Sequence, residues 1–374
     1  MKPLVQVERI EVEELSVPTA DPFVIATGEV RATRSVLVRA TVNGNVGLGE
    51  GSCLPPVTRE DQPEALSAIQ RAAPKLLGVD GLGALRDALD RELSTFPVAR
   101  AAVEVAVLDA AARKDKQPLW RMLGGPFDAD PIETDITIPI LPPARMGELA
   151  AQWWARGFKK LKVKAGKNLD DDLRALEAIR RAAPGAAFQP DANGGLSIEG
   201  ALAWLAGAKK LGARVLCFEQ PCATVDELFE LSKKTTVPLI ADESVKTLAD
   251  FAAVALRQAV AGVNLKLSKS GGILEAQAIG RAARARGMLV MVGGMVETRL
   301  GMTAAAHLAA ALGGVDFADL DTAFLLTEEH FQGGYRDEGA VLHLSDAPGL
   351  GIDARSSKRG LAPKVPVPGG GPTT

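Results

Sequence analysis

The sequence predicts an α/β protein built on a (β/α) barrel, with a smaller unit of mixed α and β structure. The 374-residue chain exceeds the usual size of a single core, so a barrel with an additional domain is expected. In its second part, short apolar strands alternate with helical stretches, and polar residues stand at or near strand ends. Successive end positions are 27, 28, 23 and 24 residues apart, which is the spacing of strand-then-helix units in such barrels.

Eight segments are expected to form the barrel strands. In chain order they are "ETDITIPI", "KKLKVKAG", "AAFQPDANGG", "RVLCFEQP", "VPLIADES", "GVNLKLSKSGG", "MLVMVGG" and "DFADLD". A doubly wound open sheet is the structural alternative, but the chain lacks a glycine-rich phosphate loop of the nucleotide-binding type. Functional-looking residues also end nearly every strand, which favours a barrel because its strand ends converge on one mouth.

The first 125 or so residues are expected to form the smaller unit. Residues 5–15 and 34–51 have strand character, and the second segment contains an Asn-Gly turn. Residues 59–78 and 96–116 carry apolar side chains at helical spacing. These segments predict an α+β domain that precedes the barrel.

Composition and charge indicate a globular protein that binds neither nucleic acid nor membranes. Hydrophobic residues make up 47% of the chain and charged residues 24%, and the net charge is −3 with both signs mixed. No apolar run approaches the roughly 20 residues that span a bilayer, and the start lacks the apolar core of a signal peptide. Three cysteines are an odd count that suits a reducing compartment, so a cytoplasmic location is expected.

Three carboxylates end consecutive predicted strands. Asp191, Glu219 and Asp242 would meet at the barrel mouth, where three acids cannot all stay ionised without a cation. All-oxygen ligation suits a hard divalent ion, with Mg²⁺ as the first choice and Mn²⁺ as a substitute. Each acid alone could be a helix cap or a surface residue, but the matched positions of all three favour a metal site.

Lysines flank these acids in the sequence and therefore around the barrel. Lys162 and Lys164 share one strand face, and Lys266 points inward between two outward leucines. From opposite walls, Lys164 and Lys266 could remove and return a proton on the α-carbon of a metal-held carboxylate. The charge of Lys162 would lower the pKa of Lys164, and Lys162 could also contact the substrate carboxylate. The alternative is an edge strand with a solvated face.

These motifs together resemble the enolase superfamily, in its muconate lactonizing subgroup. The resemblance covers residues 133–325 and is carried by "KLKVKAG", "PDANGG", "FEQP", "ADES", "NLKLSKSGG" and "MVGGMVETRLG". The stretch "GLGEG" in the N-terminal part is similar to the family's capping domain. The resemblance implies a modified (β/α)7β TIM barrel, capped by an α+β domain that the N-terminal segment and the C-terminal end form together.

The same resemblance implies the roles of the site residues. It places Mg²⁺ on the three acids and makes the two opposed lysines acid/base groups that work through an enediolate. Asn193 and Glu243 would lie beside the metal ligands. Within the chain, the cap would cover residues 1–125 and the barrel 126–344, and residues 345–374 would return to the cap and end in a disordered Pro- and Gly-rich tail. A homo-oligomer is also expected.

The stretch "DFADLDTAFLL" favours one activity within this family. Asp319 and Asp321 are one residue apart and would face the same way, so this pair of like charges needs a cation such as a substrate ammonium. The pair resembles the Asp-x-Asp motif of dipeptide epimerases, and Glu297 is expected near the site. The predicted reaction is therefore a 1,1-proton transfer at the C-terminal residue of an L,L-dipeptide, with a small dipeptide as substrate.

The preferred side chain stays open at this stage. Where Ala-Glu epimerases carry an arginine in a cap loop, this chain has Gly28 in "DPFVIATGEV", so an acidic second residue is not expected. Asp21 and Glu29 could favour a cationic side chain, whereas Phe23 and its neighbours could favour an apolar one. The alternatives are N-acylamino acid racemase with o-succinylbenzoate synthase activity, and muconate cycloisomerase, whose substrates carry no free ammonium. A Schiff-base aldolase and a non-catalytic binding protein are rivals from other classes.

Overall fold

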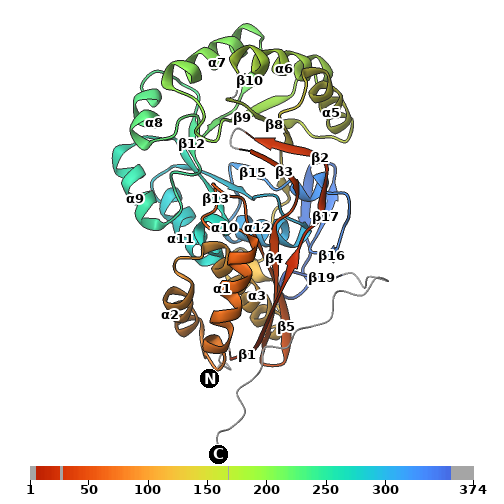
Figure 1. Ribbon diagram of the computed structural model, residues 1–374, viewed down its shortest axis with the longest axis vertical. Helices are drawn as coiled ribbons and strands as arrows, with labels where there is room; N and C mark the ends of the chain where they lie inside the picture. Colours follow the sequence, from red (N-terminus) through yellow and green to blue (C-terminus); the bar gives the residue numbers. More distant parts are fainter. Residues whose placement is uncertain (1–5, 26–27, 167, 355–374) are drawn as a thin grey trace, which may run out of the picture.

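The computed structural model describes residues 6–25, 28–166 and 168–354, and the predicted disordered tail lies outside them. An antiparallel sheet with helices lies at one end of the long axis, and a ring of parallel strands with outer helices lies at the other (Figure 1). The predicted class, an α/β barrel with an α+β cap, is confirmed.

The cap consists of a three-stranded antiparallel sheet and three helices that pack against it. The sheet order is β1-β4-β5, and the bounds are β1 (Val7–Leu15), β4 (Ser35–Val42), β5 (Asn45–Ser52), α1 (Gln62–Leu76), α2 (Leu82–Leu93) and α3 (Pro97–Lys114). Asn43 and Gly44 make the predicted turn, with φ angles of 47° and 75°. Helix α2 was not predicted, because Gly81 and Gly83 at its start weaken the helical pattern.

Strand β5 lies in backbone contact with α3 through three alternate glycines. A Cβ on Gly47, Gly49 or Gly51 would lie 2.2, 2.1 or 2.5 Å from a backbone oxygen of α3, closer than two such atoms can approach. The "GLGEG" motif is therefore a packing motif, since only glycine allows the strand to lie this close to the helix.

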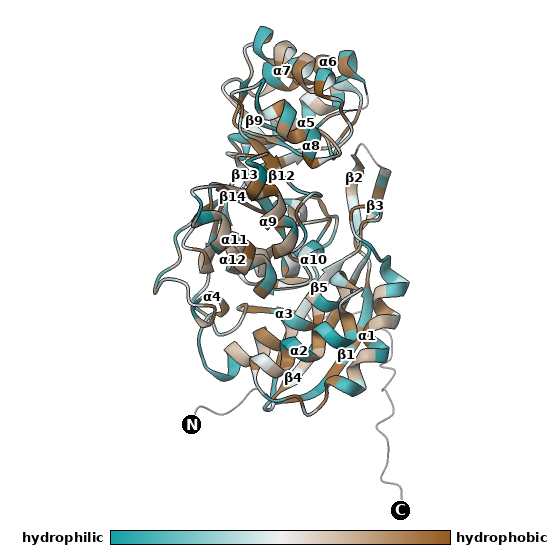
Figure 2. Cartoon of the chain, turned by 90° about the vertical axis from the view of Figure 1, so that its left-hand side faces the viewer, coloured by the Kyte–Doolittle hydropathy of each residue, from teal (hydrophilic) through white to brown (hydrophobic). Residues whose placement is uncertain are grey.

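A β-hairpin reaches from the cap to the barrel. Strand β2 (Pro18–Ile25) pairs with β3 (Gly28–Ala32), and both views show the hairpin beside the barrel strands (Figures 1 and 2). Phe23 packs against Val296 of the barrel, and Val24 O accepts a hydrogen bond from Ile140 N at 3.1 Å. This segment was predicted to be a loop, and that prediction is wrong, because the segment forms a β-hairpin. The β-branched and aromatic residues on both arms favour paired strands.

Eight parallel strands form the barrel, and each strand except the last is followed by an outer helix. The sheet order is β7-β8-β9-β11-β12-β13-β14-β15. The strands are β7 (Ile136–Ile138), β8 (Lys160–Lys164), β9 (Ala187–Asp191), β11 (Phe218–Glu219), β12 (Leu239–Ala241), β13 (Gly262–Lys266), β14 (Leu289–Gly293) and β15 (Phe317–Asp319). The helices are α5 (Pro143–Ala155), α6 (Leu169–Ala182), α7 (Ile198–Lys210), α8 (Val225–Ser232), α9 (Leu248–Arg257), α11 (Ile273–Arg284) and α12 (Arg299–Ala311).

This element order is (β/α)7β, and every predicted barrel segment contains one of the strands. Two short elements, β10 (Arg214–Val215) and α10 (Leu267–Ser270), are added to it. The ring nearly closes between its first and last strands, because Asp135 N donates to Ala318 O at 3.0 Å. Cys217, Ile240 and Met291 form a small apolar cluster inside the ring, and the polar strand ends lie beyond it.

The C-terminal part of the described chain contacts both units. Its short elements, together with two earlier ones, are α4 (Leu119–Met122), β6 (Ile132–Glu133), η1 (Thr322–Leu325), β16 (Phe331–Gly333), β17 (Tyr335–Glu338), β18 (Val341–Leu344) and β19 (Ile352–Ala354). Leu350 N donates to Asp109 of α3 at 2.7 Å, which joins this segment to the cap. The domain boundaries at residues 125 and 344 stay a prediction. None of the described helices is long and apolar enough to cross a lipid bilayer.

Candidate active site

The register of the barrel strands brings the predicted acids together at one end of the ring. Lys164 is paired with Asp191, and Asp191 with Glu219, across neighbouring strands. Asp242 follows β12 directly, and the three carboxylates are completely buried. Strand alternation and the parallel register therefore place residues from separate units in one layer, as the sequence predicts.

Lys164 and Lys266 lie on opposite sides of this layer. Three strands (β9, β11 and β12) separate β8 from β13 in one direction, and three (β14, β15 and β7) separate them in the other. Both side chains line one cavity at the cap side of the ring, and each is almost fully buried. A planar carbon between them could be approached from its two faces.

Each lysine is ion-paired with the acids. Lys164 Nζ lies 2.6 Å from Asp191 Oδ2, and Lys266 Nζ lies 2.7 Å from Asp242 Oδ2. Lys162 Nζ lies between three carboxylates, at 3.1 Å from Asp191, 2.6 Å from Glu219 and 2.7 Å from Asp319. Lys162 therefore faces the acids as well as the cavity that it lines.

The pKa values of these groups reflect burial opposed by pairing. Burial disfavours the charged form of Lys266, but Asp242 and Glu219 outweigh it and raise the pKa of the ammonium. Burial and the neighbouring charge of Asp191 raise the pKa of Glu219 to about 7. In Asp242, burial is outweighed by Lys266 and Lys269, which hold the pKa of the carboxyl well below its usual range. The negative charges of Asp242 and Glu219 therefore favour the charged form of Lys266.

The donor set of the predicted trio fits a hard divalent cation. All three residues offer carboxylate oxygens from adjacent strand ends, which are the ligands that Mg²⁺ and Mn²⁺ prefer. Glu219 Oε2 is buried and lies 2.6 Å from Lys162 Nζ, but it accepts no hydrogen bond among the described residues. Burying an anionic oxygen without a hydrogen-bond donor is costly, and a divalent cation would add to the positive charge that Lys162 already provides there.

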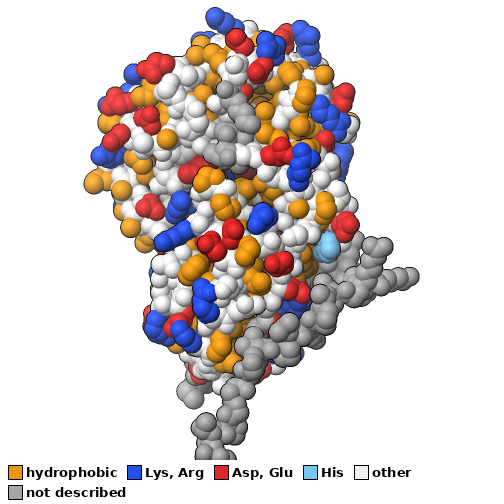
Figure 3. Space-filling view, viewed as in Figure 1, with side chains coloured by type: hydrophobic (Ala, Val, Ile, Leu, Met, Phe, Trp, Pro, Cys, Tyr) orange, Lys and Arg blue, Asp and Glu red, His pale blue; other side chains and the backbone are white. Residues whose placement is uncertain are grey.

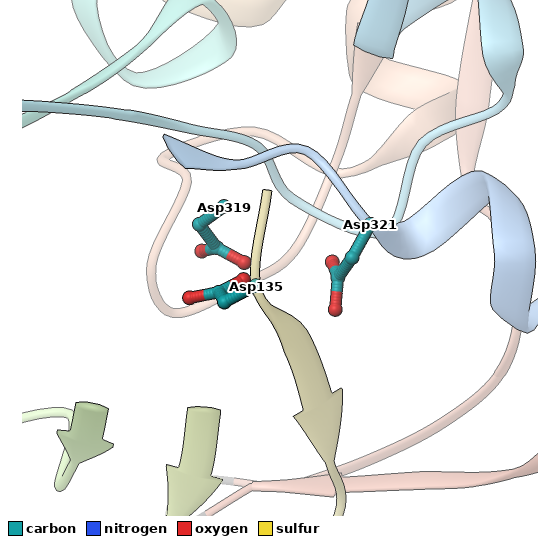
Figure 4. A group of neighbouring side chains, drawn as sticks. All are labelled: Asp135, Asp319 and Asp321. Carbon is teal, nitrogen blue, oxygen red and sulfur yellow. The ribbon is translucent and has the colours of Figure 1, made fainter. Parts of the chain in front are cut away.

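A second carboxylate cluster lies at the end of β15. Oxygens of Asp135, Asp319 and Asp321 lie within 4.8 Å of one another, a spacing that could also hold a cation, and Figure 4 shows them converging near the start of β7. Burial and the Asp319 charge raise the pKa of Asp321 to about 7. Asp319 lines the cavity, whereas Asp321 is fully buried and accepts a hydrogen bond from the backbone N–H of Thr137.

Asp135 was missed in the sequence, although it stands two residues before Thr137 and so shares its inward face. It is fully buried, and its Oδ2 accepts a hydrogen bond from Gln189 of β9. Asp135 Oδ1 and Asp321 Oδ1 have no hydrogen-bond donor among the described residues. The alternation of side-chain faces along "ETDITIPI" could have identified Asp135 as an inward-facing residue.

Of the two predicted neighbours of the three acids, Asn193 contacts Asp191 and Glu243 contacts Asn193. Asn193 N donates to Asp191 Oδ1 at 2.9 Å, and Asn193 Nδ2 donates to Glu243 Oε1 at 3.0 Å. The backbone of Asn193 is left-handed, with φ 45°, which lets the turn after β9 fold back over the strand end. Asn193 therefore holds both acids in place.

Three further positioning residues were not singled out in the sequence. Lys269 Nζ donates to Asp242 Oδ1 and to Asp242 O, each at 2.6 Å, from the same "KLSKS" stretch as Lys266. Gln220 Oε1 accepts from Asp242 N at 2.8 Å, and Asn264 Nδ2 donates to Glu219 Oε1 at 2.8 Å. In the sequence, only their position beside the motif residues pointed to these three residues, because their contacts are formed with residues of other strands.

The cavity itself lies between the cap and the barrel and spans about 390 Å³ including open solvent. The cap contributes three apolar side chains, Phe23, Leu54 and Val57, and the barrel contributes Met295. The remaining lining residues are polar or small: Thr137, Lys162, Lys164, Asn193, Lys266, Gly294, Asp319 and Thr322. One wall is thus apolar and the opposite wall carries the charged layer.

The other residues predicted near the substrate do not line this cavity. Asp21 forms an ion pair with Arg145 at 3.0 Å, and exposed Gly28 has no atom within 4 Å of a built Cβ. Glu297 is fully buried next to the cavity, and its Oε1 accepts from Met295 N at 3.0 Å. Burial and the nearby Glu50 carboxylate raise the pKa of Glu297 to about 8.

Two protein-family profiles match most of the chain. Residues 145–358 match "Enolase C-terminal domain-like", and residues 9–124 match "Mandelate racemase / muconate lactonizing enzyme, N-terminal domain". An L-Ala-D/L-amino acid epimerase from Populus trichocarpa is 39% identical over 356 residues, covering 92% of this chain and 84% of that protein. An aromatic dipeptide epimerase from Herpetosiphon aurantiacus is 36% identical over 353 residues, covering 93% and 98%.

A similar solved structure carries a ligand. The dipeptide epimerase from Cytophaga hutchinsonii, complexed with Mg and the dipeptide D-Ala-L-Val, superposes with a TM-score of 0.89 at 30% identity. The match covers 94% of this chain and 97% of that one.

Proposed function

This chain belongs to the enolase superfamily, in the mandelate racemase/muconate lactonizing enzyme group, and on that premise we propose that it is a Mg²⁺-dependent dipeptide epimerase. The reaction is inversion of the α-carbon of the C-terminal residue of an L,L-dipeptide. The observation that carries the proposal is the placement of Lys164 and Lys266 on opposite sides of a layer of buried acids.

Asp191, Glu219 and Asp242 would hold the divalent ion, and the ion would supply positive charge that offsets the negative charge formed as the substrate α-carbon loses its proton. Lys164 or Lys266 takes the α-proton at Nζ, and the other lysine returns a proton at the opposite face. Both lysines begin from ion pairs with acids, so their contacts must loosen before either can act as a base.

Asp319 would receive the free α-amino group of the substrate. Its carboxylate lines the cavity beside Lys162, and its buried neighbours Asp135 and Asp321 place further carboxyl oxygens behind it. An ammonium at this point gains a charge-assisted hydrogen bond, whereas an N-acylated substrate brings no charge to offset the cluster. This favours dipeptides over N-acylamino acids and over muconate-type substrates.

The side-chain preference is proposed to be apolar. The acids that could have selected a cationic side chain are engaged elsewhere, since Asp21 pairs with Arg145 and Glu29 pairs with Arg31. The cap wall of the cavity is formed by apolar side chains, which gain free energy only when they cover apolar surface. The name of the Herpetosiphon relative, an aromatic dipeptide epimerase, supports this preference.

Deuterium exchange tests the proposal. In D₂O with Mg²⁺, L,L-dipeptides with apolar second residues should gain one dalton and convert to L,D products. Lys164→Ala and Lys266→Ala should each abolish the epimerisation, whereas Lys160→Ala, on the same face of β8 but ion-paired with Glu133, should retain it. Exchange only on N-acylated amino acids would reject the epimerase in favour of a racemase.

A further inference from the structure

A second crevice lies between the cap and the barrel, behind the cap loop that lines the candidate active site. It spans about 1020 Å³ including open solvent, and it is formed by the loop before α1, by α2 and α3 of the cap, and by the residues around α9 and α10. Val57 lines both the crevice and the active-site cavity, so the two spaces lie on either side of the same loop. Nothing in the proposed reaction uses this crevice.

The crevice is lined by several cationic side chains, of which Arg100 and Lys269 are paired with the buried acids Glu104 and Asp242. Its cationic side chains outnumber its two carboxylates, which belong to Asp90 and Glu275; the cations are Arg59, Arg86, Arg100, Lys246 and Lys269. Figure 3 shows Lys and Arg side chains gathered at the left-hand junction of cap and barrel. Such a concave basic surface raises the local concentration of small anions.

Two of these cations are free to bind a ligand. Neither Arg59 nor Lys246 forms an ion pair with any part of the chain that the structure describes. Lys246 Nζ has only a carbonyl contact, with Val57 O at 3.5 Å. Arg86 lies 3.7 Å from Glu275 and 3.9 Å from Asp90, which is too long for a strong pair.

One residue of the crevice wall also has a buried hydroxyl without a partner. Ser270 lines it, is 7% exposed, and its Oγ has no hydrogen-bond partner among the described residues. A buried hydroxyl without a partner costs free energy, and a ligand oxygen in the crevice would satisfy it. The hydroxyl and the two free cations together form a site of the type that binds oxyanions.

We propose that this crevice binds a small phosphate-bearing anion through Arg59, Lys246 and Ser270. Arg59 offers a planar fork of N–H donors and Lys246 a compact ammonium, and both geometries suit phosphate oxygens. The anion is either free phosphate or the phosphate group of a small phosphomonoester. Occupancy would also contact the loop that carries Val57, so the ligand lies one side chain away from the substrate cavity.

Isothermal titration calorimetry of the full-length, Mg²⁺-loaded protein with inorganic phosphate tests this proposal. Saturable binding is expected, weakened at least about tenfold in Arg59→Ala and Lys246→Ala, and weakened in Ser270→Ala. Arg180→Ala, on the exposed face of α6, and Lys164→Ala, in the active site, should bind as the unaltered protein does. A parallel titration with glycerol phosphate distinguishes the sources, because tighter binding than inorganic phosphate identifies a phosphomonoester.

Two kinds of result would overturn the proposal of a phosphate site. Absence of saturable binding, or equal affinity in the unaltered protein and the crevice variants, overturns the proposal. Loss of binding in Lys164→Ala with retention in Arg59→Ala and Lys246→Ala would assign the phosphate to the active site and overturn it as well. Thermal unfolding without phosphate checks that each variant is folded.

Discussion

The carboxylate of Glu50, on cap strand β5, caps the first turn of barrel helix α12 through Thr298. Glu50 Oε2 accepts from Thr298 Oγ1 at 2.6 Å, and Glu50 Oε1 accepts from Thr298 N at 3.1 Å. Gly301 N donates to the same carboxylate at 3.0 Å. A residue of one unit thus satisfies the free N–H groups of a helix in the other, which ties the cap to the loop that carries Glu297.

Glu50→Ala should destabilise the protein by about 3 kcal/mol, because it leaves several buried donors without an acceptor. Glu50→Gln keeps one carbonyl acceptor and should cost less. Urea unfolding followed by circular dichroism measures both variants. Equal stability of Glu50→Ala and the unaltered protein would show that the contact between cap and barrel does not depend on this carboxylate.

The backbone contact between β5 and α3 can be tested with a pair of glycines. Gly49→Ala should destabilise by roughly 3 kcal/mol or more, because its Cβ would lie 2.1 Å from a backbone oxygen of the helix. Gly28→Ala is the matched control, since it is in an exposed strand with open space around it, and should change stability by no more than about 0.5 kcal/mol. Similar melting temperatures for the two variants would contradict the packing role.

The two carboxylate clusters can be distinguished by metal binding. Mg²⁺ should raise the melting temperature of the unaltered protein, because a ligand that binds only the folded state stabilises it. Asp242→Asn should lose this response, whereas Asp321→Asn should retain it. The reverse pattern would place the metal among Asp135, Asp319 and Asp321 instead.

The apolar wall of the cavity predicts a change in substrate preference. Phe23→Ala removes a ring that lines the cavity, so kcat/KM for dipeptides with a large apolar second residue should fall about tenfold or more. The value for L-Ala-L-Ala should fall less, because its methyl group has little apolar surface for the ring to cover. An equal loss for all dipeptides would indicate a disturbed site rather than a specificity contact.

Acid should destabilise the protein in part through His307. Burial lowers the pKa of this imidazole from 6.5 to about 3 in the folded state, so the unfolded state takes up the proton first as pH falls. The contribution of His307 to the free energy of unfolding is complete above pH 6.5 and is lost progressively toward pH 3. About 2–3 kcal/mol of it is lost by pH 4.5.

His307→Asn removes the titrating ring while keeping an acceptor near Trp120 N, which donates to Nδ1 at 3.2 Å. Unfolding free energies at pH 7 and pH 4.5 should therefore fall less steeply for the variant than for the unaltered protein. The comparison between the two proteins cancels other groups, such as Glu297, that change stability with pH in the opposite direction. Identical slopes would contradict the assignment.

Much of the fold could be predicted because its signals are local. The period of strand and helix, and the inward alternation of Lys164 and Lys266, depend only on residues close in the chain. The hairpin of β2 and β3 was missed because its position depends on contacts with the barrel, and α2 was missed because glycines flank its start. Asp135 and Lys269 were missed because their partners lie on other strands.

The sequence by itself determined the barrel, the polar residues at its strand ends and the superfamily, because repeated spacing and alternation specify which face each side chain takes. Only the tertiary structure decided which residues contact one another across the ring: it paired Lys162 with Asp319 and engaged Asp21 with Arg145, leaving an apolar wall at the cavity. The physical reason is that ion pairs and cavity walls depend on distances between elements far apart in the chain, and burial in the folded protein sets those distances.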